Sequence, residues 1–120
     1  MISVTLPWPD KVLSPNARVH WSRKAKAVKT ARQSAAWLVM ERTNAWRSLI
    51  GWGGASVSMT FGPPDNRRRD RDNLIASMKA ATDGIADAIG IDDSKFETSY
   101  RMGSPIKGGA VLVTISEAKP

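Results

Sequence analysis

The sequence predicts a small α+β domain with a mixed β-sheet and two main helices. Three observations predict this class. Four short segments alternate apolar and polar residues, as half-buried strands do. Two longer segments repeat apolar residues at helical spacing. The order along the chain is strand, helix, strand, helix, strand, strand, which favours an α+β domain. With 120 residues the chain is expected to form one domain over 1–120.

The first half of the chain is expected to contain a strand, a helix and a second strand. Apolar residues alternate with polar ones over 2–6 and again over 55–61. A helix is expected from the N-cap residue Ser22 to about Arg42, a stretch without Gly or Pro. A long loop precedes this helix, and a Trp- and Gly-rich connection over 46–54 follows it.

The second half is expected to contain one helix followed by two strands. The helix begins directly after Asp72 and carries its apolar residues on one face. They are Leu74, Met78, Ala81, Ile85 and Ile89. Gly90 is a suitable residue for the end of this helix. Strands are expected at Phe96–Met102 and over 111–115.

The charge of the chain favours an anionic partner. Lys and Arg number 18 and Asp and Glu 11, which gives a net charge of +7 and a pI near 10.3. Such a balance is typical of proteins that bind nucleic acid or an anionic membrane surface. The alternative is a soluble protein whose basic charge has no such role.

Residue types that are absent or rare exclude several kinds of chemistry. The chain has no cysteine, which excludes disulfides and thiolate metal sites. His20 is the single histidine, so mechanisms that need two histidines are excluded. The sequence has no apolar run long enough to span a membrane, and its start is strand-like rather than a signal peptide. We expect a cytoplasmic protein with no membrane partner and no small-molecule organic cofactor.

A run of arginines leads into two closely spaced carboxylates. Asp70 and Asp72 are separated by one residue, so on an extended chain both side chains share a face. Carboxylate pairs suit Mg²⁺, which is usually held by one or two carboxylates together with phosphate oxygens. The arginines of 67–69 favour a phosphate-bearing substrate. The alternative is a pair of solvated turn carboxylates.

A lysine and further aspartates accompany the second helix. Lys79 lies seven residues after Asp72, so the two share a helical face, which Asp83 joins. Asp92 and Asp93 form a second acidic cluster beyond the helix. A helix of roughly 16 residues is about 24 Å long. The clusters meet only if the chain doubles back or if two subunits share one surface. An ordinary i,i+4 ion pair between Lys79 and Asp83 is the alternative.

The first helix carries five cations within ten residues. They are Arg23, Lys24, Lys26, Lys29 and Arg32. A cluster of this kind is expected to contact phosphates, although a solvated helix face is an equal alternative. Among the tryptophans, Trp21 and Trp52 are the two to test for stacking on unpaired bases. The others are expected to pack in the core or in a dimer interface.

In these residues the chain resembles the RusA family of Holliday junction resolvases, small endonucleases associated with phages and prophages of bacterial hosts. The resemblance spans most of the chain and rests on the order and spacing of short motifs. They are Thr5-Leu6-Pro7-Trp8-Pro9, Ser14-Pro15-Asn16 leading to His20-Trp21, Arg68-Arg69-Asp70-Arg71-Asp72-Asn73-Leu74, Lys79-Ala80-Ala81-Thr82-Asp83-Gly84-Ile85, Asp92-Asp93-Ser94 and Lys107-Gly108-Gly109.

The resemblance implies a homodimer that resolves four-way DNA junctions by paired symmetric nicks, using Mg²⁺ or Mn²⁺. Asp70, Asp72 and Asp93 would be the metal ligands, and Lys79 would be the essential lysine. The residues expected to contact DNA are Arg67, Arg68, Arg69, Arg71, Lys24, Lys26 and Lys29.

Bound metal would polarise the scissile phosphate and activate water, and Lys79 could stabilise the transition state. Two other functions stay open. One is a basic nucleic-acid-binding module without catalysis, whose aspartates are helix-cap and turn residues. The other is a metal nuclease with broader activity on branched DNA.

Overall fold

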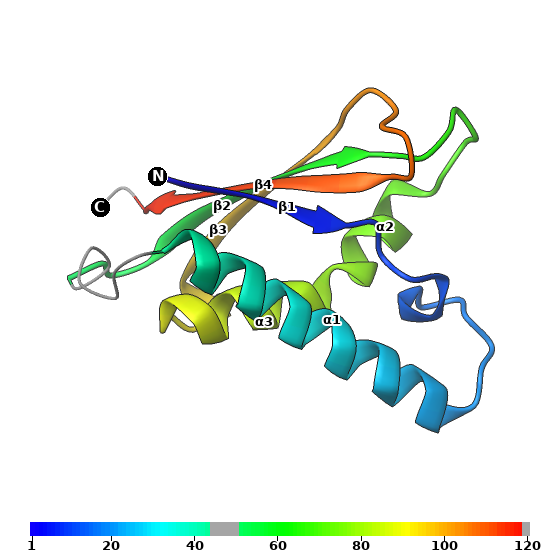
Figure 1. Cartoon of the computed structure of the whole chain (residues 1–120), viewed down its shortest axis with the longest axis horizontal. Coiled ribbons are helices and arrows are strands. Elements are labelled where there is room, and N and C mark those ends of the chain that lie inside the picture. Colours follow the sequence, from blue (N-terminus) through cyan, green and yellow to red (C-terminus); the bar gives the residue numbers. More distant parts are fainter. Residues whose placement is uncertain (44–50, 119–120) are drawn as a thin grey trace.

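The fold is built on one four-stranded mixed sheet, shown in the computed structural model of the chain (Figure 1), which describes residues 1–43 and 51–118. The strands are β1 (Ile2–Pro7), β2 (Ala55–Gly62), β3 (Phe96–Met102) and β4 (Ala110–Glu117), in the spatial order β1-β4-β2-β3. β4 is antiparallel to both β1 and β2, whereas β3 runs parallel to β2. The predicted α+β class with a mixed sheet is therefore confirmed, and all four strands form where the alternation placed them.

The helices cover one face of this sheet. They are α1 (Trp21–Arg42), α2 (Arg71–Ser77) and α3 (Lys79–Ile89), with short 3-10 helices η1 (Lys11–Leu13) and η3 (Asp93–Lys95). Figure 1 shows α1 and α3 side by side below the sheet, with the start of β1 and the end of β4 at its opposite end from α2. η1 gives regular structure to part of the segment predicted as a loop. Of the connection predicted over 46–54, residues 46–50 lie outside the described residues.

The core lies between the sheet and the two longer helices. In β1, β2 and β4, alternate residues are buried there, as the period of two predicts. These residues are Val4, Leu6, Ala55, Val57, Met59, Phe61, Val111, Val113 and Ile115. From the helices, Ala35 and Val39 of α1 and Ile85 and Ile89 of α3 complete the core.

The N-cap of α1 lies two residues before the predicted one. The helix begins at Trp21, and His20 rather than Ser22 is the N-cap. The Nδ1 atom of His20 accepts a hydrogen bond from the Ser22 backbone N–H at 3.2 Å. An imidazole nitrogen thus satisfies a backbone donor that Ser, Thr, Asp or Asn more often satisfies.

The single helix predicted after Asp72 is wrong, because Met78 divides it into α2 and α3. The backbone of Met78 (φ −91°, ψ 2°) leaves helical geometry, and its N–H donates to the Ile75 carbonyl at 3.0 Å, which tightens the last turn. The Met78 side chain is buried in the core. α3 then starts at Lys79, and in its first turn the N–H and the hydroxyl of Thr82 both donate to the Met78 carbonyl at 2.8 Å. Asp72 therefore does not lie on the same continuous helix as Lys79.

The structure explains why glycine is needed at positions 84 and 90. Gly84 lies where α3 touches α1, and a Cβ atom there would meet the backbone oxygen of Arg32 at 2.2 Å. Gly90 ends α3 in the left-handed conformation (φ 72°), as predicted for this position. Among the described residues, none of the helices has the length and apolar composition needed to cross a membrane.

Candidate functional site

Lys79 joins two carboxylates that come from different elements. Its Nζ atom lies 2.6 Å from Oδ2 of Asp93 in η3 and 3.0 Å from Oδ1 of Asp83, one turn further along α3. We call these three residues the Lys79 cluster. The predicted ion pair with Asp83 is present. Asp93 reaches the same nitrogen because the chain reverses after Gly90.

The electrostatics of the cluster favour a permanently charged lysine. The hydrogen bond with Asp93, followed by that with Asp83, raises the pKa of Lys79 above its usual range. All three side chains remain accessible, since 67% of Lys79, 28% of Asp83 and 33% of Asp93 is exposed. One cation and two carboxylates leave a net negative charge on an accessible surface.

Asp92, beside the cluster, has a structural role. Its carboxylate caps η3 by accepting hydrogen bonds from the Ser94 hydroxyl and the Ser94 backbone N–H, the latter at 3.2 Å. These hydrogen bonds lower the pKa of Asp92, and the nearby charges of Lys79 and Lys95 lower it further. Asp92 therefore fixes the turn that presents Asp93.

Asp70 and Asp72 lie at the start of α2. Asp70 is the N-cap residue, and its Oδ1 atom accepts a hydrogen bond from the Asn73 backbone N–H at 3.2 Å. Asp72 lies in the first turn, where the helix dipole favours negative charge. Both side chains are exposed. Each aspartate thus stabilises the start of α2, in addition to any catalytic role.

The predicted metal ligands are not gathered into one group by a single chain. Within residues 1–43 and 51–118, no three His, Cys, Asp or Glu side chains are placed to hold a metal ion. At Asp93 the Lys79 ammonium already supplies the neutralising positive charge. The donor chemistry suits Mg²⁺, but the geometry of one chain does not form the site. The three-aspartate metal site therefore stays a prediction.

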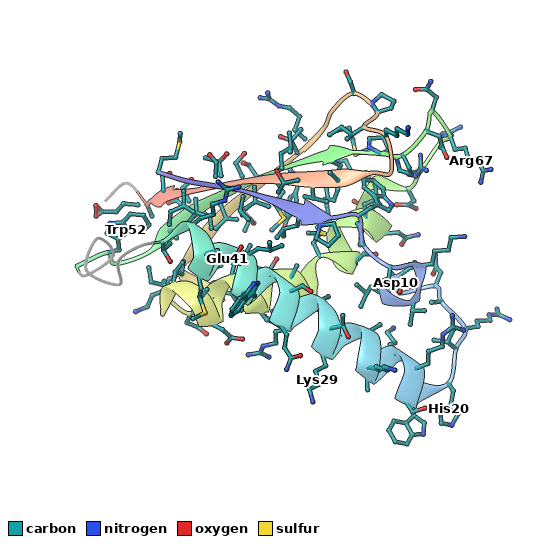
Figure 2. All side chains as sticks on the ribbon, viewed as in Figure 1. Asp10, His20, Lys29, Glu41, Trp52 and Arg67 are labelled. Atoms are coloured by element: carbon teal, nitrogen blue, oxygen red, sulfur yellow. The ribbon has the colours of Figure 1, made fainter. Side chains whose placement is uncertain are left out.

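The arginines of the 67–71 segment divide into two kinds. Arg69 is only 19% exposed, pairs with Asp65 at 2.9 Å, and places its guanidinium 5.6 Å from the Trp8 ring centroid. Arg71 donates to the Tyr100 backbone oxygen on β3 at 2.9 Å. By contrast, Arg67 is 86% exposed, and Figure 2 shows it extending from the loop beyond β2.

The carboxylate of Asp65 organises this loop. It accepts a hydrogen bond from the Arg67 backbone N–H at 2.9 Å, and this bond, supported by Arg69, lowers the pKa of Asp65. Arg68 is exposed and forms no ion pair with another described residue. Arg67 lies 3.8 Å from Asp65 but is largely exposed, so within the 67–71 segment Arg67 and Arg68 have the side chains most accessible to a phosphate backbone.

Four of the five cationic side chains of α1 also remain available to contact a phosphate backbone. Arg32 is the exception, because its guanidinium binds both oxygens of Asp87 on α3, at 2.6 and 2.9 Å. This contact raises the pKa of Arg32 and lowers the pKa of Asp87. In the part of the chain that the structure describes, no ion pair involves Arg23, Lys24, Lys26 or Lys29.

The two tryptophans singled out from the sequence have different environments. Trp21 is 75% exposed and lies against His20, with ring centroids 5.4 Å apart. Trp52 is half-buried and packs against the core. Trp21 is therefore available for stacking at the start of the cationic helix, whereas Trp52 has a packing role.

The sequence did not indicate two features. The first is the place of Asp83 in one site with Asp93. The sequence predicts Asp83 as an ion-pair partner of Lys79, and this i,i+4 spacing is the signal that pointed to it. The second feature is a pocket of about 410 Å³ between α1, the end of β1, η1 and the junction of α2 and α3. Its residues come from distant segments, so no local pattern marks it.

Together, fold and site define a small, basic α+β protein with an accessible lysine–carboxylate cluster. No family model matches the chain. A protein of Xylella fastidiosa (strain Temecula1 / ATCC 700964), described as an uncharacterized protein, is 46% identical over 119 residues. The match covers 97% of this chain and 76% of that protein, and the chain belongs to the same family as this relative.

Proposed function

We propose that the chain is a RusA-like, Mg²⁺-dependent endonuclease that resolves four-way DNA junctions by paired nicks. The observation that carries the proposal is the contact between Lys79 and Asp93 at 2.6 Å. These residues belong to two separate motifs of the RusA resemblance, yet they meet at one accessible place. A lysine held by carboxylates beside an anionic substrate can stabilise negative charge that develops during phosphodiester cleavage.

The surface charges support DNA as the substrate. Arg67 and Arg68 extend from the loop beyond β2, and Lys26 and Lys29 are exposed on α1. Cations of this kind bind phosphates without reading sequence, which suits an enzyme that selects a DNA shape. The net charge of +7 adds long-range attraction.

A homodimer is part of the proposal, because one chain does not gather the three predicted metal ligands. Two copies would bring a second set of Asp70, Asp72 and Asp93 to a shared surface. Mn²⁺ is expected to substitute for Mg²⁺, since both accept oxygen ligands.

One set of observations favours a second candidate, a basic nucleic-acid-binding module without catalysis. Asp93 and Asp83 are neutralised by Lys79, and Asp70 caps α2. In this candidate the aspartates maintain the fold, while the exposed cations bind nucleic acid.

The deciding experiment compares nicking and binding of a synthetic four-way junction, with linear duplex and flap DNA as further substrates. The variants are Asp72→Asn and Asp93→Asn, and Glu97→Gln is the matched control because Glu97 is an exposed carboxylate on β3 that belongs to neither motif. We expect the wild type and Glu97→Gln to nick the junction only with Mg²⁺ or Mn²⁺. Both aspartate variants should retain binding and lose nicking.

Nicking that persists without divalent metal, or in both aspartate variants, would overturn the metal-nuclease proposal. Binding without any nicking by the wild type would favour the binding module. Equal cleavage of junction and flap would indicate the broader branched-DNA nuclease. Binding should be measured at several salt concentrations, because contacts made only by cations weaken steeply as salt rises.

A further inference from the structure

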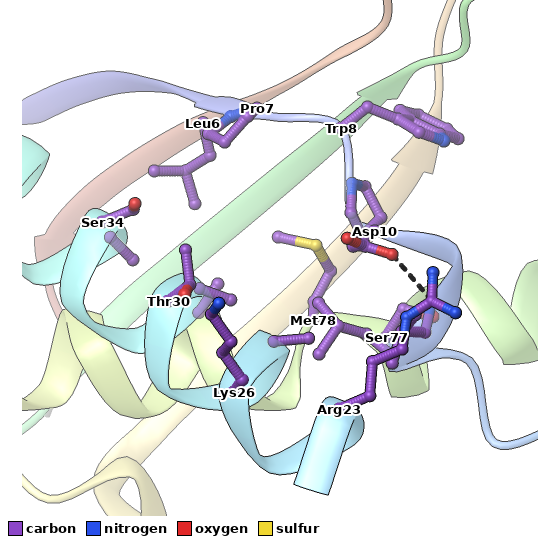
Figure 3. Close-up of a pocket in the computed structure, with 17 residues that line it drawn as sticks. Leu6, Pro7, Trp8, Asp10, Arg23, Lys26, Thr30, Ser34, Ser77 and Met78 are labelled. Carbon is purple, nitrogen blue, oxygen red and sulfur yellow. Dashed lines mark hydrogen bonds between the residues drawn. The ribbon is translucent and has the colours of Figure 1, made fainter. Parts of the chain in front are cut away.

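The pocket of about 410 Å³ has a volume in the range typical of small-molecule sites. Figure 3 shows that α1 forms one wall, while Leu6 from β1 and Met78 from the α2–α3 junction lie across from it. η1 and the segment that follows β1 close one end. We call this space the α1 pocket.

The α1 wall carries a line of polar side chains beside the alanines Ala27, Ala31 and Ala35, which also line the pocket. Arg23, Lys26, Thr30 and Ser34 follow one another at steps of three and four residues, so they form one line along the helix. Neither cation is paired with a carboxylate among the described residues. The pocket thus offers two positive charges followed by two hydroxyl groups.

The opposite wall is apolar. Leu6, Val12 and Met78 are buried core residues that present their surfaces to the pocket. The one carboxylate in the lining, Asp10, has an oxygen that accepts a hydrogen bond from the Val12 backbone N–H at 2.9 Å (Figure 3). A ligand that fits both walls has a flat or bulky apolar body, hydrogen-bonding atoms along one edge, and a negative charge at one end.

Trp8 connects this pocket with the loop that carries Arg67, Arg68 and Arg69. It lines the pocket, and the Arg69 guanidinium lies 5.6 Å from its ring centroid. Its ring also packs edge-on against Phe61, with centroids 6.1 Å apart. The proposed DNA contacts at Arg67 and Arg68 therefore lie next in sequence to a residue that packs on the pocket wall.

We propose that the α1 pocket binds one unpaired deoxynucleotide of the DNA substrate. Its base lies between the apolar wall and the hydroxyls of Thr30 and Ser34, and its phosphate lies on Arg23 and Lys26. This inference rests on the proposed function, since it names where a strand of branched DNA is held. A nucleotide that is unpaired in the substrate enters a pocket at least cost, because no base pair is broken, whereas a fully paired four-way junction would have to open one pair at the branch.

The line of polar groups favours a nucleotide over a fatty acid. An acyl chain cannot form hydrogen bonds, so it would leave the hydroxyls of Thr30 and Ser34 without a partner in the ligand. A free phosphate ion, in turn, would leave the apolar wall unused. A nucleotide satisfies both walls and both cations.

The test is calorimetric titration of the full chain, without divalent metal and without junction DNA. The probes are deoxyadenosine 5′-monophosphate, deoxyadenosine, inorganic phosphate and laurate. We expect saturable binding of the monophosphate at one site per chain, and about tenfold weaker binding of deoxyadenosine, which lacks the charge-assisted contacts.

Matched variants locate the site. Lys26→Ala should weaken binding of the monophosphate about tenfold, whereas Arg42→Ala, which removes an exposed cation on the same helix outside the lining, should leave it unchanged. Ala31→Leu should block the pocket, and Ala25→Leu, at an exposed position outside it, should not. Thr30→Leu is a second blocking variant at an exposed position, should Ala31→Leu fail to fold.

Phosphate binding as tight as that of the monophosphate would overturn the inference, as would binding unaffected by a folded blocking variant. Displacement of the monophosphate by laurate at lower concentration would also overturn it, in favour of a lipid site. Failure here is distinct from failure of the proposed function, because no cleavage is measured. Nucleotide binding without junction nicking would leave this inference standing beside the binding module.

Discussion

Lys79 and Asp93 form an ion pair of 2.6 Å although 14 residues separate them in the chain. Lys79 is the first residue of α3, and Asp93 is the first residue of η3. The whole of α3 therefore lies between the two partners in sequence. Because of this contact, Lys79 and Asp93 should be tested together. A variant at Lys79 can then separate an effect on nicking from an effect on folding.

Replacing Lys79 by Met should remove nicking while preserving the fold. The variant keeps the long side chain but leaves Asp83 and Asp93 without their shared cation. We expect nicking of the junction to fall about a hundredfold or more. The free energy of unfolding should change by less than about 1 kcal/mol, because exposed ion pairs contribute little.

The control for this variant is Lys11→Met, which removes an exposed lysine from η1. It should match the wild type in nicking and in thermal denaturation. Undiminished nicking by Lys79→Met would contradict a role for the Lys79 cluster in catalysis.

Arg67 and Arg69 should have opposite effects. Arg67→Ala removes an exposed cation, so junction affinity should fall and the slope of its salt dependence should decrease by about one. Arg69→Ala removes the ion pair with Asp65 and the contact with Trp8, so it should lower the melting temperature. Salt titrations of binding and thermal denaturation of both variants check this. Equal losses of affinity and stability in the two variants would contradict the division.

The Arg32–Asp87 contact should make stability depend on acid pH. The Arg32 guanidinium lowers the pKa of Asp87 below its ordinary value of 3.8. A lowered carboxyl pKa stabilises the fold above the pKa of the unfolded chain, and this contribution is lost as pH falls through the folded value. Arg32→Ala should therefore be less stable than wild type at neutral pH.

The difference between Arg32→Ala and wild type should shrink from neutral to acid pH, as Asp87 becomes protonated in both. Urea denaturation at the two pH values measures it. Lys29→Ala, which removes an unpaired cation from the same helix, is the control and should show no such pH dependence. A constant difference at both pH values would mean that Asp87 is not the group involved.

Gly84→Ala should destabilise the protein by about 1–3 kcal/mol, the usual cost of overpacking. Its Cβ atom would lie 2.2 Å from the backbone oxygen of Arg32, and backbone cannot move aside without shifting a helix. Gly53→Ala is the matched control, because no atom lies within 4 Å of the corresponding Cβ position. Denaturant unfolding of both variants gives the comparison, and an unchanged stability for Gly84→Ala would show that α1 and α3 can separate slightly.

The sequence predicted the strands well because alternation in β2 and β4 reports directly which residues face the core. It predicted the end of α1 at Arg42 and its N-cap to within two residues, since no Gly or Pro interrupts that segment. It did not predict the break at Met78, because the apolar spacing of 74–89 is the same for one straight helix as for two. That break depends on how Met78 packs in the core, which is a tertiary effect.

The candidate site was predictable only in part for a similar reason. The spacing of Lys79 and Asp83 predicted their ion pair, which depends on a single helix. Asp93 reaches Lys79 because the chain reverses after Gly90, and residue spacing alone does not predict that reversal. The α1 pocket combines Leu6, Lys26 and Met78 from three distant segments, so only the folded chain reveals it.

The tight backbone approach at Gly84 has a consequence for substrate recognition. It fixes α3 against α1, so the lysine at the start of α3 and the cations along α1 keep a constant separation. If the chain binds DNA as proposed, a rigid surface of this kind would favour one spacing between phosphates, independently of base sequence. Nucleic acids with a different backbone rise, such as A-form duplexes, should therefore match these charges less well than B-form arms of the same length.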